Sequence, residues 1–383
     1  MRIAMFTETY PPTTDGVAAY VHALKKQLER MGHDVVVFTA TKSREKNVHS
    51  FVSLTVPFYR QYKFAVCPYF SSYYLLRKFR PDVVHLHTPF AVGSAGLFVA
   101  RALRVPVVGS FHTNIKEMSR SIKSIFANRG FVAMGWRYAL GVYWRCNALT
   151  VPSNVVKDFI YSSAIKPFRV KIRVVWTLPD LEDTLKNIDR FDMRRELGIE
   201  GKFTVTFLSR ITKDKGIYTF LGCAERNRDM VFLVGGTGPE EKNVKEYVKL
   251  KKLENVKILG FVPEEKKGAL LRASDVVVLP SFADTFGIIL IEAMACGAVA
   301  VGSNAGGIKE FLKDGENGLL FEAGNVEHLS SVLRNLHNND AMRKSLKQNG
   351  EKFVREHGDI RASAEKMLEI YREVVAGGWK KFI

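Results

Sequence analysis

Residues 275–304 read DVVVLPSFADTFGIILIEAMACGAVAVGSN, and this stretch decides the fold class. Two apolar runs, DVVVLP and AVAVGSN, flank a helical segment, so the stretch predicts a strand, a helix and a second strand. The runs are continuously apolar, which is typical of a parallel sheet covered on both faces. Between them, Asp284 and Glu292 stand eight positions apart, on either side of Phe286 and Gly287. Either this is an ordinary buried helix that carries a glutamate, or these residues bind one ligand.

The same alternation of strands and helices runs through the whole chain. The first series contains RIAMF, DVVVFTA, PDVVHLHT, VPVVGSFHT and ALTVPS, and the second series starts with FTVTFLSR at residues 203–210. A chain of 383 residues is too long for one typical core. The pattern therefore predicts an α/β protein of two Rossmann-like, doubly wound domains facing a cleft. We place the first domain at residues 1–180, a linker at 181–200 and the second domain at 201–360.

The composition argues against several classes of protein. With 46% hydrophobic and 25% charged residues, the chain has the composition of a soluble globular protein. No segment approaches the roughly 18 apolar residues of a membrane-spanning helix, and the first apolar run meets Glu8 and two prolines too early for a signal peptide. Scattered cysteines argue against a disulfide framework or a zinc site and favour a cytoplasmic location: Cys67, Cys146, Cys223 and Cys296.

Positive charge is concentrated in the first half of the chain. Residues 1–180 contain 25 Lys and Arg against 9 Asp and Glu, whereas residues 181–383 contain 32 against 30. This asymmetry favours an anionic partner, such as nucleic acid, a membrane surface or a phosphorylated substrate. A lysine-rich solvated surface is the alternative explanation.

Cations and glycines follow the predicted strands of the second half. Arg210 and Lys215 lie where a helix begins, and two cations at a helix start suit a di- or triphosphate, although such a pair is also common on solvated surfaces. Gly235, Gly236 and Gly238 follow the next strand. They suit either a plain tight turn or the close approach of a ligand to the backbone.

The segment after DVVVLP adds a helix start and two acids. We expect the helix to begin near Phe286, with the Asp284 carboxylate accepting free N–H groups near the N-cap. Gly287 costs roughly 1 kcal/mol relative to alanine in a first helical turn, but it leaves those N–H groups open to a pyrophosphate. Glu292 lies among aliphatic residues and needs polar partners, for which ligand hydroxyls are suitable.

Residues 203–325 resemble the nucleotide-sugar-binding domain of the retaining glycosyltransferases of family 4, which have the GT-B fold. The family motif E-x-F-G-x-x-x-x-E-A-M-A-x-G reads D-T-F-G-I-I-L-I-E-A-M-A-C-G from Asp284 onward. The R-x4-K pair, the turn GGTGP and V-x-x-x-G-x-V at 256–262 accompany it. The resemblance implies two Rossmann-like domains facing a cleft, and a C-terminal helix at 361–383 that packs back on the first domain. Asp284 stands where glutamate is commoner.

The resemblance also assigns roles to single residues. The donor-binding residues that it implies are Gly16, Val17, Arg210, Lys215, Gly236, Val262, Asp284, Phe286, Gly287, Ile288 and Glu292. The catalytic residues that it implies are His112, Asp284, Arg210 and Lys215. In this scheme the two cations bind the diphosphate, Glu292 binds the ribose and Asp284 binds the sugar. His112, which by itself would be an ordinary hydrogen-bonded histidine at a strand end, contacts the sugar near the reacting carbon.

Neither a metal nor another cofactor is expected. His85 and His87 lie on one strand face and would suit a metal pair, but no third ligand accompanies them in the sequence, and a D-x-D motif is absent. By resemblance, the acceptor hydroxyl attacks from the face that the diphosphate leaves, and the leaving phosphate takes the proton. Arg210 and Lys215 offset its charge.

Two basic stretches point to the acceptor. Residues 46–81 and 118–157 contain no acidic residue and many aromatic ones, which suits the boundary of an anionic membrane. Nucleic acid suits such a surface too, but no nucleic-acid motif accompanies it. In the alternative interpretation, the aromatic residues belong to the core and the lysine and arginine side chains are solvated. Residues 83–113 resemble diacylglycerol glucosyltransferases and related lipid glycosyltransferases, and mannosyltransferases share much of this segment.

We therefore predict a retaining hexosyltransferase that uses a UDP-glucose-like or GDP-mannose-like donor. We expect a lipid acceptor at the inner face of the membrane, where the protein binds peripherally, and no nucleic-acid partner. A soluble sugar or polyol-phosphate acceptor, or a non-catalytic membrane- or nucleic-acid-binding protein, is the alternative. Leu178 stands where the family commonly has glycine, which leaves the acceptor open. The oligomeric state is not predicted.

Overall fold

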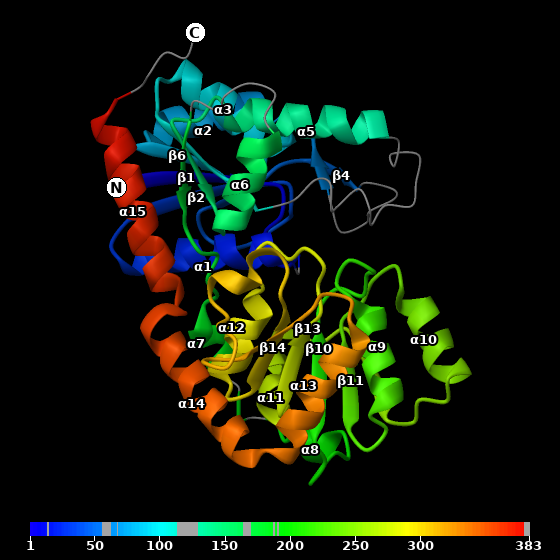
Figure 1. Cartoon of the computed structure of the whole chain (residues 1–383). Coiled ribbons are helices and arrows are strands. Elements are labelled where there is room, and N and C mark those ends of the chain that lie inside the picture. Colours follow the sequence, from blue (N-terminus) through cyan, green and yellow to red (C-terminus); the bar gives the residue numbers. More distant parts are fainter. Residues whose placement is uncertain are drawn as a thin grey trace. The chain divides into compact units, whose positions relative to one another are not determined.

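The structure is a computed structural model that describes residues 1–13, 15–55, 63–66, 68–112, 129–163, 170–186, 188–189 and 191–378. Two compact units make up the chain, and Figure 1 colours them along the sequence. Unit 1 comprises Met1–Thr177 and Ile360–Ile383, and unit 2 comprises Leu178–Asp359. The C-terminal helix therefore belongs to the same unit as the N-terminus.

Unit 1 is built on a seven-stranded sheet in the order β3-β2-β1-β6-β7-β8-β9, with every pair of neighbours parallel. The strands are β1 (Arg2–Thr7), β2 (Asp34–Thr39), β3 (Val48–Ser50), β6 (Val83–Leu86), β7 (Val107–Ser110), β8 (Ala148–Val151) and β9 (Lys171–Val174). The strand order reverses between β1 and β6, which makes this the topological switch point of the sheet. A separate antiparallel hairpin consists of β4 (Ser53–Thr55) and β5 (Lys63–Ala65).

Helices cover both faces of this sheet, as the alternation of side chains along β1 shows. Ile3 and Met5 pack into a core with α1 and α15, whereas Ala4 and Phe6 pack into a second core with α2 and α3. The helices of the unit are α1 (Gly16–Arg30), α2 (Tyr69–Phe79), α3 (Ala91–Ala102), α5 (Arg129–Tyr143), α6 (Asn154–Ser163) and α15 (Ile360–Ala376). Burial on both faces explains why the strands are continuously apolar.

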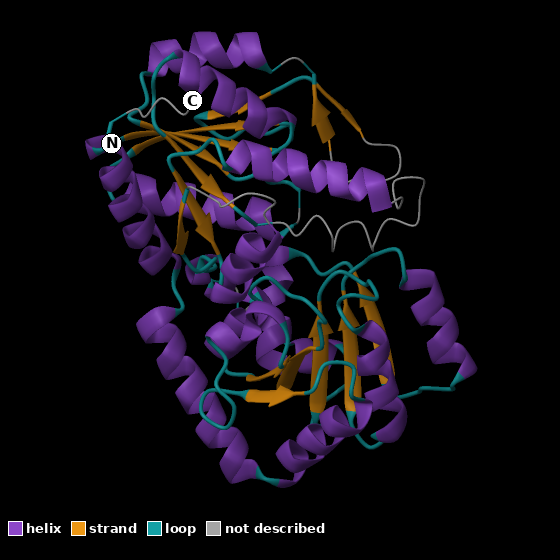
Figure 2. Cartoon of the chain, turned by 45° about the horizontal axis from the view of Figure 1, so that its top comes forward, coloured by secondary structure: helices purple, strands orange, loops and turns teal. Residues whose placement is uncertain are grey.

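Unit 2 repeats this architecture with a six-stranded parallel sheet in the order β12-β11-β10-β13-β14-β15. Figure 2 shows the strands in orange. They are β10 (Thr204–Leu208), β11 (Val231–Gly235), β12 (Val256–Gly260), β13 (Val276–Leu279), β14 (Val299–Ser303) and β15 (Leu319–Phe321). Here the strand order reverses between β10 and β13, which places the switch point of this sheet between them.

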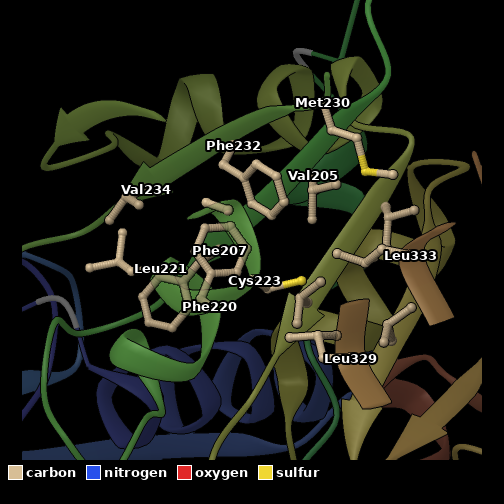
Figure 3. Close-up of a cluster of buried hydrophobic side chains, with 14 of the residues drawn as sticks. Val205, Phe207, Phe220, Leu221, Cys223, Met230, Phe232, Val234, Leu329 and Leu333 are labelled. Atoms are coloured by element: carbon tan, nitrogen blue, oxygen red, sulfur yellow. The ribbon is translucent and has the colours of Figure 1, made fainter. Parts of the chain in front are cut away.

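The main core of unit 2 lies on one face of this sheet, and Figure 3 shows its close packing. Phe232 and Val234 face α9 and α13 in this core, while Val231 and Leu233 face α8 and α11 on the opposite side. The helices are α7 (Leu181–Leu185), α8 (Met193–Glu196), α9 (Ile217–Arg226), α10 (Glu241–Leu250), α11 (Glu264–Ala273), α12 (Ile288–Ala295), the 3-10 helix η2 (Gly306–Glu310), α13 (Val326–Asn338) and α14 (Asp340–His357).

The predicted fold class, two doubly wound α/β domains, is confirmed by these two sheets. Residues 181–200 differ from our expectation of a linker, because they hold the short helices α7 and α8 and belong to unit 2. Polar residues in this stretch serve as helix caps. The Asp180 carboxylate accepts from the N–H of Glu182, and the Asp192 carboxylate accepts from the N–H of Arg195.

The glycine turn after β11 draws three strand ends together. Gly236 has a φ of +123°, and a Cβ there would lie 2.0 Å from the carbonyl oxygen of Ser209. Its N–H donates to the carbonyl oxygen of Gly260 at 2.7 Å. A Cβ at Gly238 would lie 2.3 Å from the carbonyl oxygen of Ile211. Only glycine therefore allows the loops after β10, β11 and β12 to approach this closely.

This turn can be tested with a matched pair of substitutions. Gly260 also has a positive φ, +68°, but a Cβ there would meet nothing within 4 Å. We expect Gly260→Ala to cost only the left-handed backbone penalty of about 1–2 kcal/mol. Gly236→Ala must in addition displace the backbone at Ser209, so its loss of unfolding free energy in urea titrations should be larger by about 2 kcal/mol or more. Equal losses would contradict the proposed close approach.

Candidate active site

The carboxyl ends of the unit 2 strands carry most of the residues that the sequence singled out in this half. Arg210 lies two residues after β10, and Asp284 lies five residues after β13. These two strands flank the switch point, where open α/β sheets bind their ligands. Gly236 directly follows β11 and Val262 follows β12 by two residues, so all four positions share one edge of the sheet.

Lys215 and Asp284 form an ion pair at this edge. The Lys215 Nζ lies 2.6 Å from Asp284 Oδ2, and both side chains are largely buried. Asp284 Oδ1 accepts from the N–H of Phe286 at 3.2 Å. Burial by itself would raise the pKa of Asp284, but the Lys215 ammonium and the N–H groups of Phe286 and Gly287 outweigh it and lower that pKa. Asp284 is therefore an anion at neutral pH.

A second glycine turn holds the backbone of Asp284. The N–H of Gly307 donates to the Asp284 carbonyl oxygen at 2.8 Å. Gly306 has a φ of +62°, and a Cβ there would lie 2.2 Å from the same oxygen. Both the side chain and the main chain of Asp284 are thus fixed by contacts within unit 2.

The helix after Asp284 begins later than expected. We predicted its start near Phe286, but α12 begins at Ile288 and Gly287 is its N-cap, with a φ of +94°. This conformation explains why a glycine stands there. Phe286 is buried and packs against Phe311, with ring centroids 5.2 Å apart. The Phe286 side chain therefore anchors the turn in the core of unit 2.

Glu292 has a lysine partner that the sequence did not reveal. Its Oε1 accepts from Lys267 Nζ at 2.6 Å and from Thr184 Oγ1 at 3.5 Å. Lys267 also pairs with Glu264. Burial would lower the pKa of Lys267, but the two glutamates outweigh it and raise that pKa. Asp284 and Glu292 therefore each have their own lysine and are not a paired general acid and base.

Lys267 escaped notice because its neighbourhood, PEEKKGALLR, reads as a solvated, charged helix start. The helical periodicity nevertheless indicates that Lys267 needs a partner. Lys267 lies three and four positions before the buried Leu270 and Leu271, so it shares their face of α11. A lysine on the buried face of a helix requires an acidic partner.

In unit 1 the start of α1 carries Gly16 and Val17. The Asp15 carboxylate caps the helix, accepting from the N–H of Val17 at 2.9 Å and of Ala18 at 2.8 Å. A Cβ at Gly16 would meet nothing within 4 Å, so packing within the described residues does not require glycine there. The open space at Gly16 is compatible with the expected approach of a ligand.

His112 lies two residues after β7, beside two other histidines of the same sheet edge. Its Nε2 is 3.1 Å from His87 Nδ1, and its ring lies 5.1 Å from that of Tyr20. Burial lowers the pKa of His112 to about 4, and it lowers the pKa of His87 as well. At neutral pH both rings are therefore uncharged and can offer hydrogen bonds but no positive charge.

The other histidine of the suspected metal pair has two hydrogen-bond partners. His85 Nε2 lies 2.7 Å from Ser110 Oγ, and His85 Nδ1 lies 2.6 Å from the hydroxyl of Tyr371. In the part of the chain that the structure describes, no group of three or more His, Cys, Asp or Glu side chains is arranged to hold a metal ion.

Glu8 is a further residue of this edge that the sequence did not single out as functional. It follows β1, and its Oε1 accepts from the N–H of Val92 in the first turn of α3 at 2.7 Å. Burial raises the pKa of Glu8 to about 7, despite the N–H groups that favour its anion. Only the typical position of functional residues, after a strand at the switch point, could have indicated it.

The aromatic residues of the two basic stretches divide between core and surface. Trp136 and Tyr143 are buried, as in the core interpretation. Phe70, Tyr74 and Tyr138 are exposed, as the surface interpretation requires. Residues 56–62 and 113–128, with Arg120, Lys123 and Phe126 among them, lie outside the described residues, as does the side chain of Phe131. Within the described chain, no helix combines the length and apolar character that crossing a membrane requires.

Two family models match the chain. Residues 14–182 match the model described as Glycosyltransferase Family 4, and residues 189–353 match the model described as Glycosyl transferases group 1. The first covers most of the N-terminal half and the second covers the edge that carries Arg210, Asp284 and Glu292.

Two characterised relatives show similarity along most of their length. An alpha-monoglucosyldiacylglycerol synthase of Streptococcus pneumoniae is 26% identical over 340 residues, which cover 84% of this chain and 75% of that protein. A GDP-mannose-dependent alpha-mannosyltransferase of Corynebacterium glutamicum is 25% identical over 332 residues, which cover 84% of this chain and 77% of that protein.

A solved structure shows the same fold. The Anabaena protein HepE, determined in complex with UDP-glucose, superposes with a TM-score of 0.77 at 18% identity, over 97% of this chain and 100% of that one. This likeness, with the two parallel sheets, establishes the GT-B type of fold.

The Lys215–Asp284 pair predicts a pH-dependent loss of stability. We expect Lys215→Met to lower the unfolding free energy at pH 7 by about 3 kcal/mol, because it leaves a carboxylate buried without its cation. Asp284 has a lowered folded pKa, so its stabilising contribution is present above its ordinary pKa of 3.8 and is lost as the pH falls through the folded value. In the variant, burial without the Lys215 ammonium favours the neutral form of Asp284, so this carboxylate takes up a proton at a higher pH than in the original protein. The deficit should therefore shrink as the pH falls toward 4.

The control is the double variant Lys215→Met with Asp284→Asn, which removes both charges and should recover most of the loss. Urea unfolding of the four proteins at several pH values measures these differences. A deficit that is independent of pH, or a double variant as unstable as Lys215→Met, would contradict the assignment.

Proposed function

Because this chain belongs to the glycosyltransferases of family 4, with a group 1 glycosyltransferase domain in its second half, we propose that it transfers a hexose from a nucleotide-diphosphate sugar to a hydroxyl group of a membrane lipid, with retention of configuration. The observation that carries this proposal is the placement of Lys215 and Asp284, 2.6 Å apart, at the switch point of the unit 2 sheet.

The donor is recognised by charge and by hydroxyl contacts. Arg210 and Lys215 bind the diphosphate, next to the N-terminus of α9. Asp284, held as an anion, accepts hydrogen bonds from hydroxyls of the sugar. Glu292 accepts from the ribose, and Lys267 keeps its carboxylate in place. The backbone beside Val262 contacts the base.

The transfer step places charge on the leaving group. The bond from the sugar carbon to the diphosphate oxygen breaks, and the acceptor oxygen forms its bond on the same face. The proton of the acceptor hydroxyl passes to the leaving phosphate oxygen. Arg210 and Lys215 stabilise the charge that develops on the diphosphate, which is the main electrostatic contribution to the rate. This scheme assigns the role to side chains, so we propose that the reaction needs no metal.

Two classes of donor fit this scheme. One relative is named for GDP-mannose, and HepE was determined with UDP-glucose. We propose a UDP-glucose-like or GDP-mannose-like donor. Asp284 is one methylene shorter than the commoner glutamate, so its contact with the sugar hydroxyls differs from that of most family members.

A donor screen tests the proposal. We expect the purified protein, in buffer with EDTA, to hydrolyse or transfer from one member of a panel of UDP- and GDP-sugars, with diacylglycerol in mixed micelles as acceptor. The matching nucleoside diphosphate should raise the Tm. The product, analysed by NMR, should keep the anomeric configuration of the donor. Turnover of the donor without any acceptor-linked product would instead indicate an epimerase or hydrolase.

Matched glutamate variants sharpen this test. Glu292→Gln should raise the donor KM by roughly 10-fold or more, since a hydrogen bond from a ligand to a charged group contributes about 1.5–3 kcal/mol. Glu327→Gln is the control, because Glu327 is an exposed glutamate that pairs with Arg226 on α9. Normal kinetics in both Glu292→Gln and His112→Ala would contradict the roles proposed for these two residues. A purified protein without transfer, together with unchanged cellular activity in both variants, would favour a non-catalytic binding protein.

A surface of unit 1 fits the proposed lipid acceptor. Phe70 and Tyr74 of α2 are 88% and 69% exposed, and Phe98 of α3 is 63% exposed. The rings of Tyr69 and Phe98 lie 5.7 Å apart, which joins α2 to α3, as Figure 1 also shows. The Tyr138 hydroxyl of α5 bonds Ser94 Oγ at 2.5 Å. We call Phe70, Tyr74, Phe98 and Tyr138 the aromatic patch.

The charge of this part of the chain complements an anionic lipid surface. Residues 46–157 contain 15 Lys and Arg but only two acidic residues, Asp82 and Glu117. Arg77 and Lys78 are exposed on α2, the helix that carries Phe70 and Tyr74. Aromatic side chains together with bases are typical of a protein surface that lies at a membrane interface. We propose that the protein binds the inner face of the membrane through this surface.

Liposome pelleting tests the membrane surface. We expect binding to vesicles with 30% phosphatidylglycerol, little binding to pure phosphatidylcholine, and release by 0.5 M NaCl because of screening. The double variant Phe70→Ser with Phe98→Ser should weaken binding about 10-fold or more at low salt, since it removes apolar side chains worth roughly 1.5–3 kcal/mol each when fully buried.

The matched control is Leu250→Ser on α10 of unit 2, which changes a side chain that is 80% exposed outside the aromatic patch. It should bind vesicles like the original protein. Equal affinity for neutral and anionic vesicles, or no effect of the patch substitutions, would overturn the proposed surface. Activity on soluble sugar acceptors alone would then favour the soluble-acceptor alternative.

A further inference from the structure

Three histidine rings lie in a row at the carboxyl edge of the unit 1 sheet, next to the switch point. His85 belongs to β6, His87 follows it, and His112 follows β7. The His85 and His87 ring centroids are 3.8 Å apart, and those of His87 and His112 are 5.3 Å apart with nearly parallel planes. His85 and His87 are fully buried, whereas His112 is partly exposed. The row therefore leads from the core to the residue that we place beside the donor sugar.

The first ring is fixed by hydrogen bonds in one direction. Burial raises the pKa of the Tyr371 hydroxyl, so it keeps its proton, and His85 Nδ1 is the hydrogen-bond partner that the structure gives it. Because a buried O–H needs an acceptor, we assign Tyr371 as the donor to His85 Nδ1. The neutral His85 then carries its proton on Nε2 and donates to Ser110 Oγ. Ser110 donates to Thr150 Oγ1 at 2.5 Å, and Thr150 donates to the carbonyl oxygen of Gly109 at 3.4 Å. Both nitrogens of His85 are thus used, and neither bonds His87.

Among the described residues, the second ring, His87, has one hydrogen-bond partner. His87 Nδ1 bonds His112 Nε2 at 3.1 Å, while His87 Nε2 is buried and has no hydrogen-bond partner in the part of the chain that the structure describes. Burial and the neighbouring histidines lower the pKa of His87, so the ring is neutral and carries one proton. A buried N–H without an acceptor is rarer and costlier than a buried lone pair without a donor. The proton therefore belongs on Nδ1.

We propose that His87 is a positioning residue that donates from Nδ1 to His112 Nε2 and thereby holds His112 as the Nδ1–H tautomer, a fixed hydrogen-bond donor for a hydroxyl of the donor sugar. This inference rests on the proposed function for its substrate, but not for the tautomer itself. His85, fixed by Tyr371 and Ser110, supports the arrangement by packing against the His87 ring.

A neutral donor suits the chemistry next to the reacting carbon. The sugar becomes more positive in the transition state of glycosyl transfer, as it does in glycoside hydrolysis. A protonated His112 would oppose that charge. Among the described residues, His112 contacts the titratable side chains of His87 and Tyr20, and both are uncharged at neutral pH because burial lowers the pKa of His87 and raises that of Tyr20. His85, next to His87, is also neutral, and Glu8 at the same edge has its pKa raised by burial to about 7. The edge of unit 1 therefore supplies a directed hydrogen bond without a cation.

Histidine-selective NMR tests the tautomer directly and without substrate. The full chain is labelled with ¹⁵N on its 9 histidines, and ring nitrogen shifts distinguish a protonated from a bare nitrogen. His112→Gln and His87→Leu identify the two sets of signals. We expect a protonated Nδ1 and a bare Nε2 for His112 at pH 7. In His87→Leu we expect His112 to become a mixture of both tautomers.

Kinetics provide the second readout, with UDP-glucose or GDP-mannose, whichever the protein turns over. His87→Leu should lower kcat roughly 10- to 100-fold, as the loss of an outer partner of a functional histidine commonly does, and leave the donor KM within about threefold. His87→Asn keeps a donor N–H near the place of Nδ1 and should recover most of the activity. Tyr371→Phe removes a different buried hydrogen bond of the same cluster; it should lower the Tm but keep both kcat and the His112 tautomer.

The outcomes are distinct. A bare Nδ1 in His112 of the original protein, or an unchanged tautomer in His87→Leu, would overturn the proposal whether or not the protein is a transferase. Equal losses of kcat in Tyr371→Phe and His87→Leu would also overturn it, because they would show a general loosening of the cluster. If His87→Leu does not fold, the His112 tautomer of the original protein and the activity of His87→Asn still decide whether the proposal holds. If no transfer is found, the proposed function fails while the tautomer measurement remains valid.

Discussion

In both sheets every strand runs parallel to its neighbours, and the candidate site depends on this constraint. Parallel strands bring all their carboxyl ends to one edge, and the connections between them place a helix start after most strands. Lys215 can therefore meet Asp284 across 69 positions of sequence, and His87 can meet His112 across 25. An antiparallel sheet would place successive strand ends on opposite edges and separate these pairs. The chemistry of each unit thus follows from the direction of its strands.

The two edges solve the problem of buried polar groups differently. In unit 2, Asp284 pairs with Lys215 and Glu292 pairs with Lys267. In each pair, the attraction between the two charges offsets the cost of removing both from water. In unit 1, His85, His87, His112 and Tyr371 stay neutral and are held by directed hydrogen bonds to one another and to Ser110. The difference matches the proposed substrate. A diphosphate needs cations, whereas the sugar carbon, which becomes positive during transfer, is better served by neutral donors.

The sequence predicts the sheets because continuous apolar strands such as residues 276–279 report burial on both faces, which is a local property. It also places Arg210 and Asp284, because strand ends are visible as the last apolar residue of each run. It does not predict the Lys267–Glu292 pair, the contact of His87 with His112 or the role of Tyr371, which joins residues 286 positions apart. These contacts depend on how helices pack on the sheet, and no periodicity encodes their partners.

Asp284 shows how one methylene changes what a carboxylate can do. Its short side chain reaches back to the N–H of Phe286, two residues on, in the manner of an Asx turn, and a glutamate is too long for the same close geometry. Oδ1 is thus directed by the turn and Oδ2 by Lys215. A carboxylate offers about four acceptor positions, and Lys215 and the N–H groups of Phe286 and Gly287 use three of them, so about one is left for a ligand, in a direction that the protein has set. Aspartate at this position therefore has less reach than glutamate but a fixed orientation. If Asp284 binds the sugar as we propose, the sugar must bring its hydroxyls to the carboxylate rather than the reverse.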